Sequence, residues 1–199
     1  MRSKRESRKF ICIIQYTIII LHLLALTGCQ SGYKGQEVII EGEGTFPPEA
    51  AGVWKTDKGN WEIEFRKDGS IVSAVIPLGN MRLYPGKVKK FPIPKYEGKG
   101  IFEPGLWRVF YDTATRELTV VLAVDHFYQD VGPDSLEGDQ TNILSGTLDL
   151  EAGEWLANVF TKGKIEALIW DGWTLIDRKV LTDEPEPVQR DPVLLQKQP

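Results

Sequence analysis

The chain has 199 residues, of which 42% are hydrophobic and 26% charged, and its formal net charge is −4. An acidic chain of this kind is not expected to bind nucleic acid or to attach electrostatically to anionic lipid. With only two cysteines, a framework of several disulfides is excluded.

Residues 1–28 have the layout of a secretory signal. Five basic residues between positions 2 and 9 precede the apolar run "FICIIQYTIIILHLLALT", and small residues end it. About 17–25 apolar residues are enough to cross a bilayer, so a permanent helical anchor is the alternative interpretation.

The segment ends on Leu26-Thr27-Gly28-Cys29, which resembles the lipobox of bacterial lipoproteins. In that family the cysteine thiol receives a diacylglyceryl group, the preceding peptide bond is cut, and the new amino group is acylated. The resemblance implies lipidation of Cys29 and stable attachment to a membrane of the bacterial cell envelope, because several acyl chains hold a protein there. Residue 30 is Gln rather than Asp, which in enteric-type lipoproteins implies the outer membrane, with the protein facing the periplasm.

Cleavage before Cys29 changes the composition of the remaining chain. Residues 1–28 contain five basic residues and one acid, so 19 basic and 27 acidic residues remain and the formal charge becomes −8. Cys12 leaves with the signal and Cys29 becomes a thioether, so no thiol is left for a disulfide, a catalytic cysteine or a zinc site. His126 is the only remaining histidine, which excludes any site that needs two.

Residues 37–181 are predicted to form a single all-β domain. Short runs of alternating apolar residues, such as Trp61, Ile63 and Phe65, are separated by turn signals. About ten strands, mostly joined by tight hairpins, predict an antiparallel up-and-down meander, either a lipocalin-like barrel or a two-sheet sandwich. Residues 29–36 are interpreted as a tether. Residues 182–199, with four prolines, are interpreted as a disordered tail.

Two predicted connections, residues 85–104 and 126–141, are much longer than the others. The meander brings both to the same end of the sheet, and long loops on a rigid scaffold commonly carry binding sites. The candidate ligand-binding residues at that end are Phe91, Tyr96, Phe102, Trp107, His126 and Tyr128. The acids of the second loop could bind calcium, but their spacing does not match an EF-hand loop, and a solvated charged loop explains them as well.

The "WDGW" stretch at residues 170–173 predicts a hairpin with Asp171 and Gly172 at the centre of a type I′ turn. This register pairs Trp170 with Trp173. The two indoles then form either a surface platform for a sugar ring or a partner, or a cross-strand pair that stabilises the hairpin.

Gly52-Val53-Trp54 on the first strand, together with Arg178 on the last, is similar to the lipocalin and calycin barrels. In that family an arginine packs over the indole and closes one end of the barrel. The resemblance implies a barrel-closing Trp54–Arg178 pair and an interior apolar pocket. The chain departs from the family pattern because it has no helix after the last strand and more than eight predicted strands.

The sequence contains no motif that assigns a catalytic residue, a metal ligand or a cofactor. Glu62 and Glu64 alternate on one strand like the paired acids of a glycosidase, but the third acid of the laminarinase-type motif is missing. Asp125 and His126 are neighbours in a predicted strand and so point to opposite faces. A hydrolase is therefore the least favoured function.

The favoured interpretation is a non-enzymatic, lipid-anchored envelope protein that binds a small apolar ligand at the end carrying the two long loops. The alternative is a β-sandwich module that binds a glycan or an envelope protein through the surface tryptophans Trp170 and Trp173. No nucleic-acid partner is expected.

Overall fold

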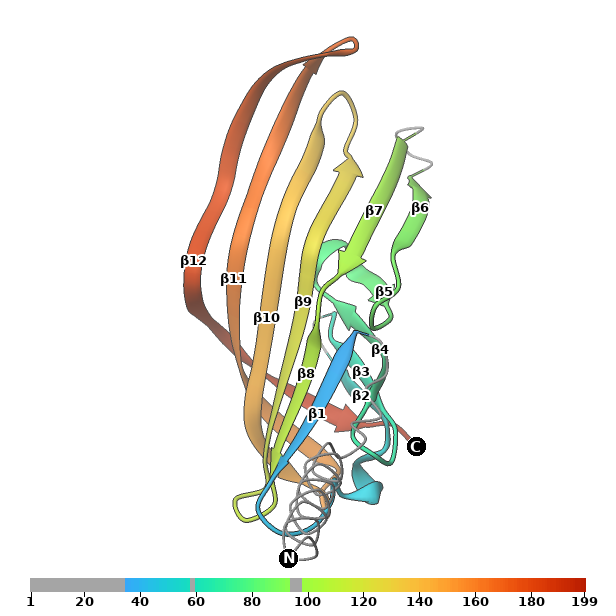
Figure 1. Ribbon diagram of the computed structural model, residues 1–199, viewed down its shortest axis with the longest axis vertical. Helices are drawn as coiled ribbons and strands as arrows, with labels where there is room; N and C mark the ends of the chain where they lie inside the picture. Colours follow the sequence, from blue (N-terminus) through green and yellow to red (C-terminus); the bar gives the residue numbers. More distant parts are fainter. Residues whose placement is uncertain (1–34, 58–59, 94–97) are drawn as a thin grey trace, which may run out of the picture. The chain divides into compact units, whose positions relative to one another are not determined.

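Twelve strands and two short 3-10 turns make up the regular structure of the computed structural model, which describes residues 35–57, 60–93 and 98–199 (Figure 1). The predicted all-β class is confirmed. The predicted signal, the lipobox with Cys29 and most of the predicted tether lie outside the described residues. The last residue assigned to the tether, Gln36, begins the first strand.

The strands carry labels in chain order. Their bounds are β1 Gln36–Glu41, β2 Gly52–Thr56, β3 Glu62–Phe65, β4 Ile71–Ile76, β5 Met81–Leu83, β6 Lys89–Ile93, β7 Gly98–Pro104, β8 Trp107–Asp112, β9 Glu117–Asp130, β10 Ser135–Asp149, β11 Glu154–Asp171 and β12 Thr174–Lys197. The 3-10 turns are η1 Pro48–Ala50 and η2 Leu78–Asn80.

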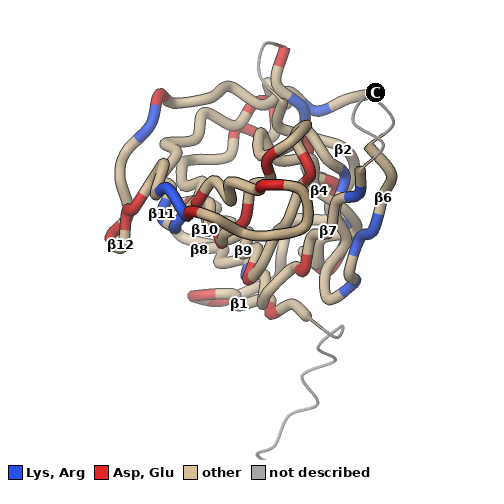
Figure 2. The backbone as a smooth tube through the Cα atoms, turned by 90° about the horizontal axis from the view of Figure 1, so that it is seen from above, with Lys and Arg blue, Asp and Glu red and all other residues tan. Residues whose placement is uncertain are grey.

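All twelve strands belong to one mixed sheet. Its main path runs β1-β8-β9-β10-β11-β12-β2-β3-β4-β5, while β7 pairs with β9 beyond the end of β8, and β6 pairs with β7. The pairs are antiparallel except β1 with β8, which is parallel. Seen from above, β11 and β12 lie at one side of the curled sheet and β2 and β4 at the other (Figure 2).

The sheet is not closed by backbone pairing between β1 and the β4–β5 end of the path. The side chain of Gln36 bridges this gap: its Nε2 donates to the Ile71 carbonyl (3.2 Å), and its Oε1 accepts from the Ile71 N–H (2.7 Å). A buried side-chain amide thus makes the two hydrogen bonds that a ladder would make. The sheet is therefore open, and a side chain bridges the gap between its two ends.

The inside of the curled sheet is filled near β2–β4 and β8–β9. Trp54, Trp107 and Trp155 are fully buried. Each indole N–H donates to a backbone carbonyl, with Ala50, Ala123 and Gly146 as the respective acceptors. Buried tryptophan normally finds such a partner, because an unpaired N–H in an apolar core is costly.

The hairpins β9–β10 and β11–β12 extend well past β1 and β8 (Figure 1). The predicted long loop 126–141 is therefore wrong: β9 runs to Asp130, β10 starts at Ser135, and only residues 131–134 connect them. Likewise, most of the predicted loop 85–104 is taken up by β6 and β7. Both segments form backbone hydrogen bonds with neighbouring strands. Their own residues do not predict this pairing, because it depends on which strands lie beside them.

The predicted disordered tail 182–199 is also corrected, because β12 continues to Lys197. Its register with β11 leaves residues 185–187 and 191–192 without a Cα partner. Pro185, Pro187 and Pro192 all fall in these irregular stretches, where proline is tolerated because no ladder N–H is needed. The strand ends by pairing with β2 through residues 195–197.

Candidate functional site

An open trough of about 880 Å³ lies against β10, β11 and β12, with Trp61 and Pro77 on its other side. This volume falls in the range of small-molecule sites, about 300–1,000 Å³. The trough is lined by residues from five separate parts of the chain.

Two glycines allow β10 and β11 to bend sharply at the trough. A Cβ placed on Gly163, whose φ is +147°, would lie 2.3 Å from the Asp139 carbonyl oxygen. A Cβ on Gly138 would lie 2.0 Å from the Lys164 carbonyl oxygen. Only glycine fits such close backbone approaches, and glycine kinks are a common way to curve a sheet.

The floor of the trough carries an unsatisfied hydrogen-bond donor. Asn142 is only 1% exposed, and its Oδ1 accepts from Gln140 Nε2 at 2.9 Å. Its Nδ2 is buried and has no hydrogen-bond partner in the described part of the chain. Trp61 and Val159, both buried, flank it among the lining residues. Buried polar groups are nearly always paired, so an orphan amide in a hollow points to a missing partner.

One wall of the trough comes from the irregular stretch of β12. Arg190 forms an ion pair with Glu184 across the turn of chain that contains Pro185 and Pro187. Gln189 and Thr182 add an amide and a hydroxyl to the same wall. Besides this ion pair, Asp139, Lys162 and Asp191 line the trough, so the lining combines charged residues of both signs with neutral amides and hydroxyls.

The opposite face of the same strands carries a network of charged residues. Glu137 accepts a hydrogen bond from Arg178 Nη1 at 3.1 Å and lies 3.2 Å from His126 Nε2. Arg178 also reaches Glu166 at 3.4 Å, and Lys164 reaches the same carboxylate at 2.8 Å. Glu137 and Glu166 alternate along their strands with Gly138 and Ile165, whose face lines the trough, so this network faces away from it.

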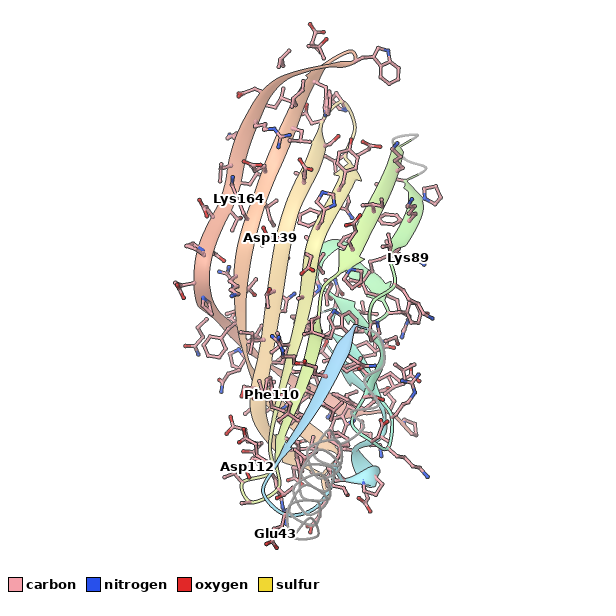
Figure 3. All side chains as sticks on the ribbon, viewed as in Figure 1. Glu43, Lys89, Phe110, Asp112, Asp139 and Lys164 are labelled. Atoms are coloured by element: carbon pink, nitrogen blue, oxygen red, sulfur yellow. The ribbon has the colours of Figure 1, made fainter. Side chains whose placement is uncertain are left out.

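Within this network the hydrogen bond from Lys164 lowers the pKa of Glu166, and the same bond raises the pKa of Lys164. Lys164 lies directly opposite Asp139 at the middle of β11 and β10 (Figure 3). The ion pair between Lys164 and Glu166 is solvent-accessible, so it stabilises the sheet only slightly.

Tyr128 and Asp130 tie the tip of the β9–β10 hairpin to β7. The Tyr128 hydroxyl donates to Asp130 Oδ1 (2.6 Å) and lies 2.7 Å from Ser135 Oγ. Asp130 Oδ2 accepts from the Lys99 N–H at 2.7 Å. Burial raises the pKa of Asp130, but its hydrogen bonds from Tyr128, Lys99 and Ser135 outweigh this and leave it below its usual value. Tyr128, a predicted ligand-binding residue, therefore makes structural contacts with Asp130 and Ser135.

The aromatic residues predicted as one ligand site are not brought together on one surface. Phe102 and Trp107 are fully buried in the core. Phe91 stacks on Phe102 at 5.9 Å between ring centroids, while His126 and Tyr128 belong to the polar contacts described above. Tyr96 lies outside the described residues.

The predicted pairing of Trp170 with Trp173 is wrong. Strand β11 continues through Asp171, so Gly172 and Trp173 are the two turn residues, and Trp170 pairs with Leu175. Gly172 has φ +58°, and Trp173 has no positive φ, which matches a type II′ rather than a type I′ turn. Trp173 thus stands at the tip with its side chain fully exposed (101%), and no platform of two adjacent indoles forms.

The predicted Trp54–Arg178 pair is also wrong. Trp54 lies on β2 opposite Lys197, at the end of β12, and its Nε1 donates to Ala50. Arg178 lies near the other end of β12, where it pairs with Glu137. The pattern "GVW" followed by a late arginine therefore does not mark a barrel-closing contact in this chain.

Sequence reasoning did not single out Gln140, Asn142 or Arg190. A signal for Asn142 was present, because it shares the period-2 face of Leu144 and Leu148, both buried. A polar residue in phase with core residues is a candidate for a buried functional group. Arg190 lay in the segment interpreted as disordered.

No family model, no curated protein and no solved structure matches the chain. In residues 35–57, 60–93 and 98–199 no group of three or more His, Cys, Asp or Glu side chains is placed to hold a metal ion. None of the described segments is a helix long and apolar enough to span a bilayer.

Proposed function

We propose that the protein is a lipid-anchored, non-enzymatic protein of the bacterial cell envelope that binds a small, neutral, polar ligand in the trough of β10, β11 and β12. The observation that carries the binding site is the unpaired Nδ2 of Asn142 on the floor of a trough of about 880 Å³. Because Asn142 is only 1% exposed, its amide must turn toward the trough for a ligand oxygen to accept from it, and that bond would remove the penalty of leaving the donor unpaired, about 1–3 kcal/mol.

The chemistry of the lining favours a hydroxylated ligand. Gln140, Thr161, Thr182 and Gln189 line the trough with amides and hydroxyls, which both donate and accept. The lining contains three acids, Asp139, Glu184 and Asp191, against the two bases Lys162 and Arg190. Arg190 is already paired with Glu184, so the site disfavours an anion. A neutral carbohydrate-sized molecule fits this lining better than the apolar ligand that the lipocalin likeness implied.

The envelope location rests on Leu26-Thr27-Gly28-Cys29 alone. Replacing Cys29 by serine is expected to release the protein from the membrane fraction and to abolish labelling by a radioactive fatty acid. Equal labelling of the wild type and Cys29→Ser would contradict the lipid anchor. The binding site would be unaffected by that result, since it rests on separate residues.

Binding is tested by saturation-transfer NMR on the full-length protein in detergent micelles, with a panel of neutral mono- and disaccharides as probes. We expect a signal for the wild type, its loss in Asn142→Leu, and its retention in the control Thr141→Val, which changes the neighbouring residue on the opposite face. A signal that survives Asn142→Leu would refute the site. No signal from any neutral sugar would refute the ligand class.

A further inference from the structure

Strand β12 has a free edge along most of its length. On one side it pairs with β11 from Thr174 to Gln196, whereas on the other it pairs with β2 only through Leu195–Lys197. Among the described residues no strand pairs with that second side between 174 and 194. Unpaired N–H and C=O groups of this kind are a template for pairing with another chain.

The two halves of this edge differ in composition. Residues 183–192, "DEPEPVQRDP", contain three prolines and five charged residues, which are common protections against edge pairing. Residues 174–182 contain no proline and carry Ile176, Val180 and Leu181, exposed to 61%, 49% and 51%. The part of the edge next to the β11–β12 turn therefore lacks proline, and its charges are confined to the central residues Asp177, Arg178 and Lys179.

This proline-free segment, "TLIDRKVLT", is nearly a palindrome. If two copies pair antiparallel with Arg178 at the centre, threonine faces threonine and leucine faces leucine at the outer positions. Ile176 then faces Val180, and Asp177 faces Lys179, each twice by symmetry. Every pair except the central one is thus matched in size or opposite in charge.

The central Arg178 pair is compatible with this arrangement. Each Arg178 guanidinium contacts the carboxylates of Glu137 and Glu166 in its own chain, so its charge is already balanced. The register with β11 is continuous from Asp177 to Val180, while Ile176 and Leu181 have no Cα partner there. The regular stretch therefore lies at the centre of the palindrome.

We propose that two copies of this chain associate through antiparallel pairing of residues 174–182, which joins their β12 strands into one continuous sheet. The self-complementary order of apolar and charged residues selects a second copy as the partner. The association shares only Thr182 with the trough, whose other β12 lining residues, Glu184 and residues 189–192, lie in the proline-containing part of the strand.

The charge pairs provide the first test, by sedimentation of the full-length protein in density-matched detergent micelles. Lys179→Asp places two carboxylates opposite each other in two symmetric positions and is expected to weaken the dimer about tenfold. The double variant Asp177→Lys/Lys179→Asp restores both pairs and is expected to restore the dimer. The control Glu186→Lys lies in the proline-rich stretch and should have no effect.

Two outcomes overturn the proposal. A wild type that sediments as a monomer at about 100 µM shows that the edge stays unpaired or serves another protein, since a functional dimer needs a micromolar or tighter dissociation constant. A double variant as weak as Lys179→Asp shows that residues 177 and 179 do not face each other.

The register provides a second test, by disulfide formation on a non-reducing gel. Directly opposed residues have Cα atoms about 4.5–5.5 Å apart, which suits a disulfide. Arg178→Cys is therefore expected to cross-link two copies. Thr174→Cys is not, because the two copies of residue 174 lie eight positions apart, about 27 Å. The wild type shows the background from the native cysteines, and equal cross-linking of both variants would refute the register.

Discussion

Replacing Asn142 by leucine is expected to leave the stability of the unliganded protein unchanged or to raise it, although the change removes a hydrogen bond. The change eliminates the buried Nδ2 donor, which has no partner in the described part of the chain and whose burial costs about 1–3 kcal/mol. It also removes the bond from Gln140 Nε2, worth about 0.5–1.5 kcal/mol. Gln140 is only half-buried, so its amide can turn to water.

The two terms predict a free energy of unfolding that is unchanged or raised by up to about 2 kcal/mol, which corresponds to a rise in Tm of up to about 8 °C for a chain of this size. Asn142→Asp is the matched contrast. It places a carboxylate at the same buried position and is expected to destabilise by several kcal/mol unless the group is protonated.

Urea unfolding followed by tryptophan fluorescence, with no sugar present, measures both variants. A loss of more than about 1 kcal/mol in Asn142→Leu would refute the reasoning, because an amide that is fully paired in the folded protein gives that result. Stabilisation together with loss of sugar binding would show that residue 142 is kept polar for a ligand rather than for the fold.

Three further predictions concern the fold itself. Gly163→Ala is expected to lower the free energy of unfolding by at least about 2 kcal/mol, since its Cβ would overlap a backbone carbonyl oxygen of the neighbouring strand. Gly172 lies at a turn where a Cβ would have no atom within 4 Å, so Gly172→Ala should lower the free energy of unfolding by only about 1 kcal/mol. Thermal unfolding compares the two variants. Gln36→Leu leaves the N–H and C=O of Ile71 unpaired between β1 and β4 and should lower the free energy of unfolding, measured by urea titration, by at least about 2 kcal/mol. An unchanged free energy of unfolding would show that other contacts hold the two ends of the sheet together. Hydrogen bonds hold the pKa of Asp130 in the folded chain below its usual value. Its contribution to stability is therefore complete above about pH 4 and declines as the pH falls through the folded-state pKa. Unfolding midpoints measured across pH 2–7 should decline less in Asp130→Asn than in the wild type, and parallel curves would show that Asp130 does not contribute in this way.

The strands that border the core were predictable because one of their faces is apolar. Trp61, Ile63 and Phe65 alternate with Glu62 and Glu64 and are buried as expected, since burying one face of a strand requires this period. The same alternation marks β8, where Trp107, Val109 and Tyr111 are buried and which pairs antiparallel with β9. The residues on the two faces of such a strand indicate which face packs against the core and which faces solvent.

The hairpin at residues 170–173 shows why register is harder to predict than strand identity. "DG" and "GW" can each form a two-residue turn around the same glycine, type I′ in one case and type II′ in the other. A shift of one residue moves every side chain to the other face. The choice between the two turns depends on how the rest of β12 pairs with β11. The four residues 170–173 do not determine that pairing.

The candidate site depended almost entirely on tertiary structure. The trough is formed by strands that meet only because β12 runs across to pair with β2, so Trp61 and Arg190, far apart in the chain, line one hollow. The aromatic residues chosen from the predicted loops were apolar enough to be core, and Phe102 and Trp107 are core. Aromatic composition does not separate a binding surface from a packed interior.

The sequence by itself determined the all-β class and the alternation of strands around the core, because the alternation of apolar and polar residues acts over a few residues. Only the tertiary structure decided that residues 126–141 and 182–197 extend the sheet. In these segments polar side chains occupy both faces and prolines interrupt the ladder, so their own composition predicts loop or disorder. Their order comes from backbone hydrogen bonds to neighbouring strands, and such bonds depend on which strands the fold places side by side.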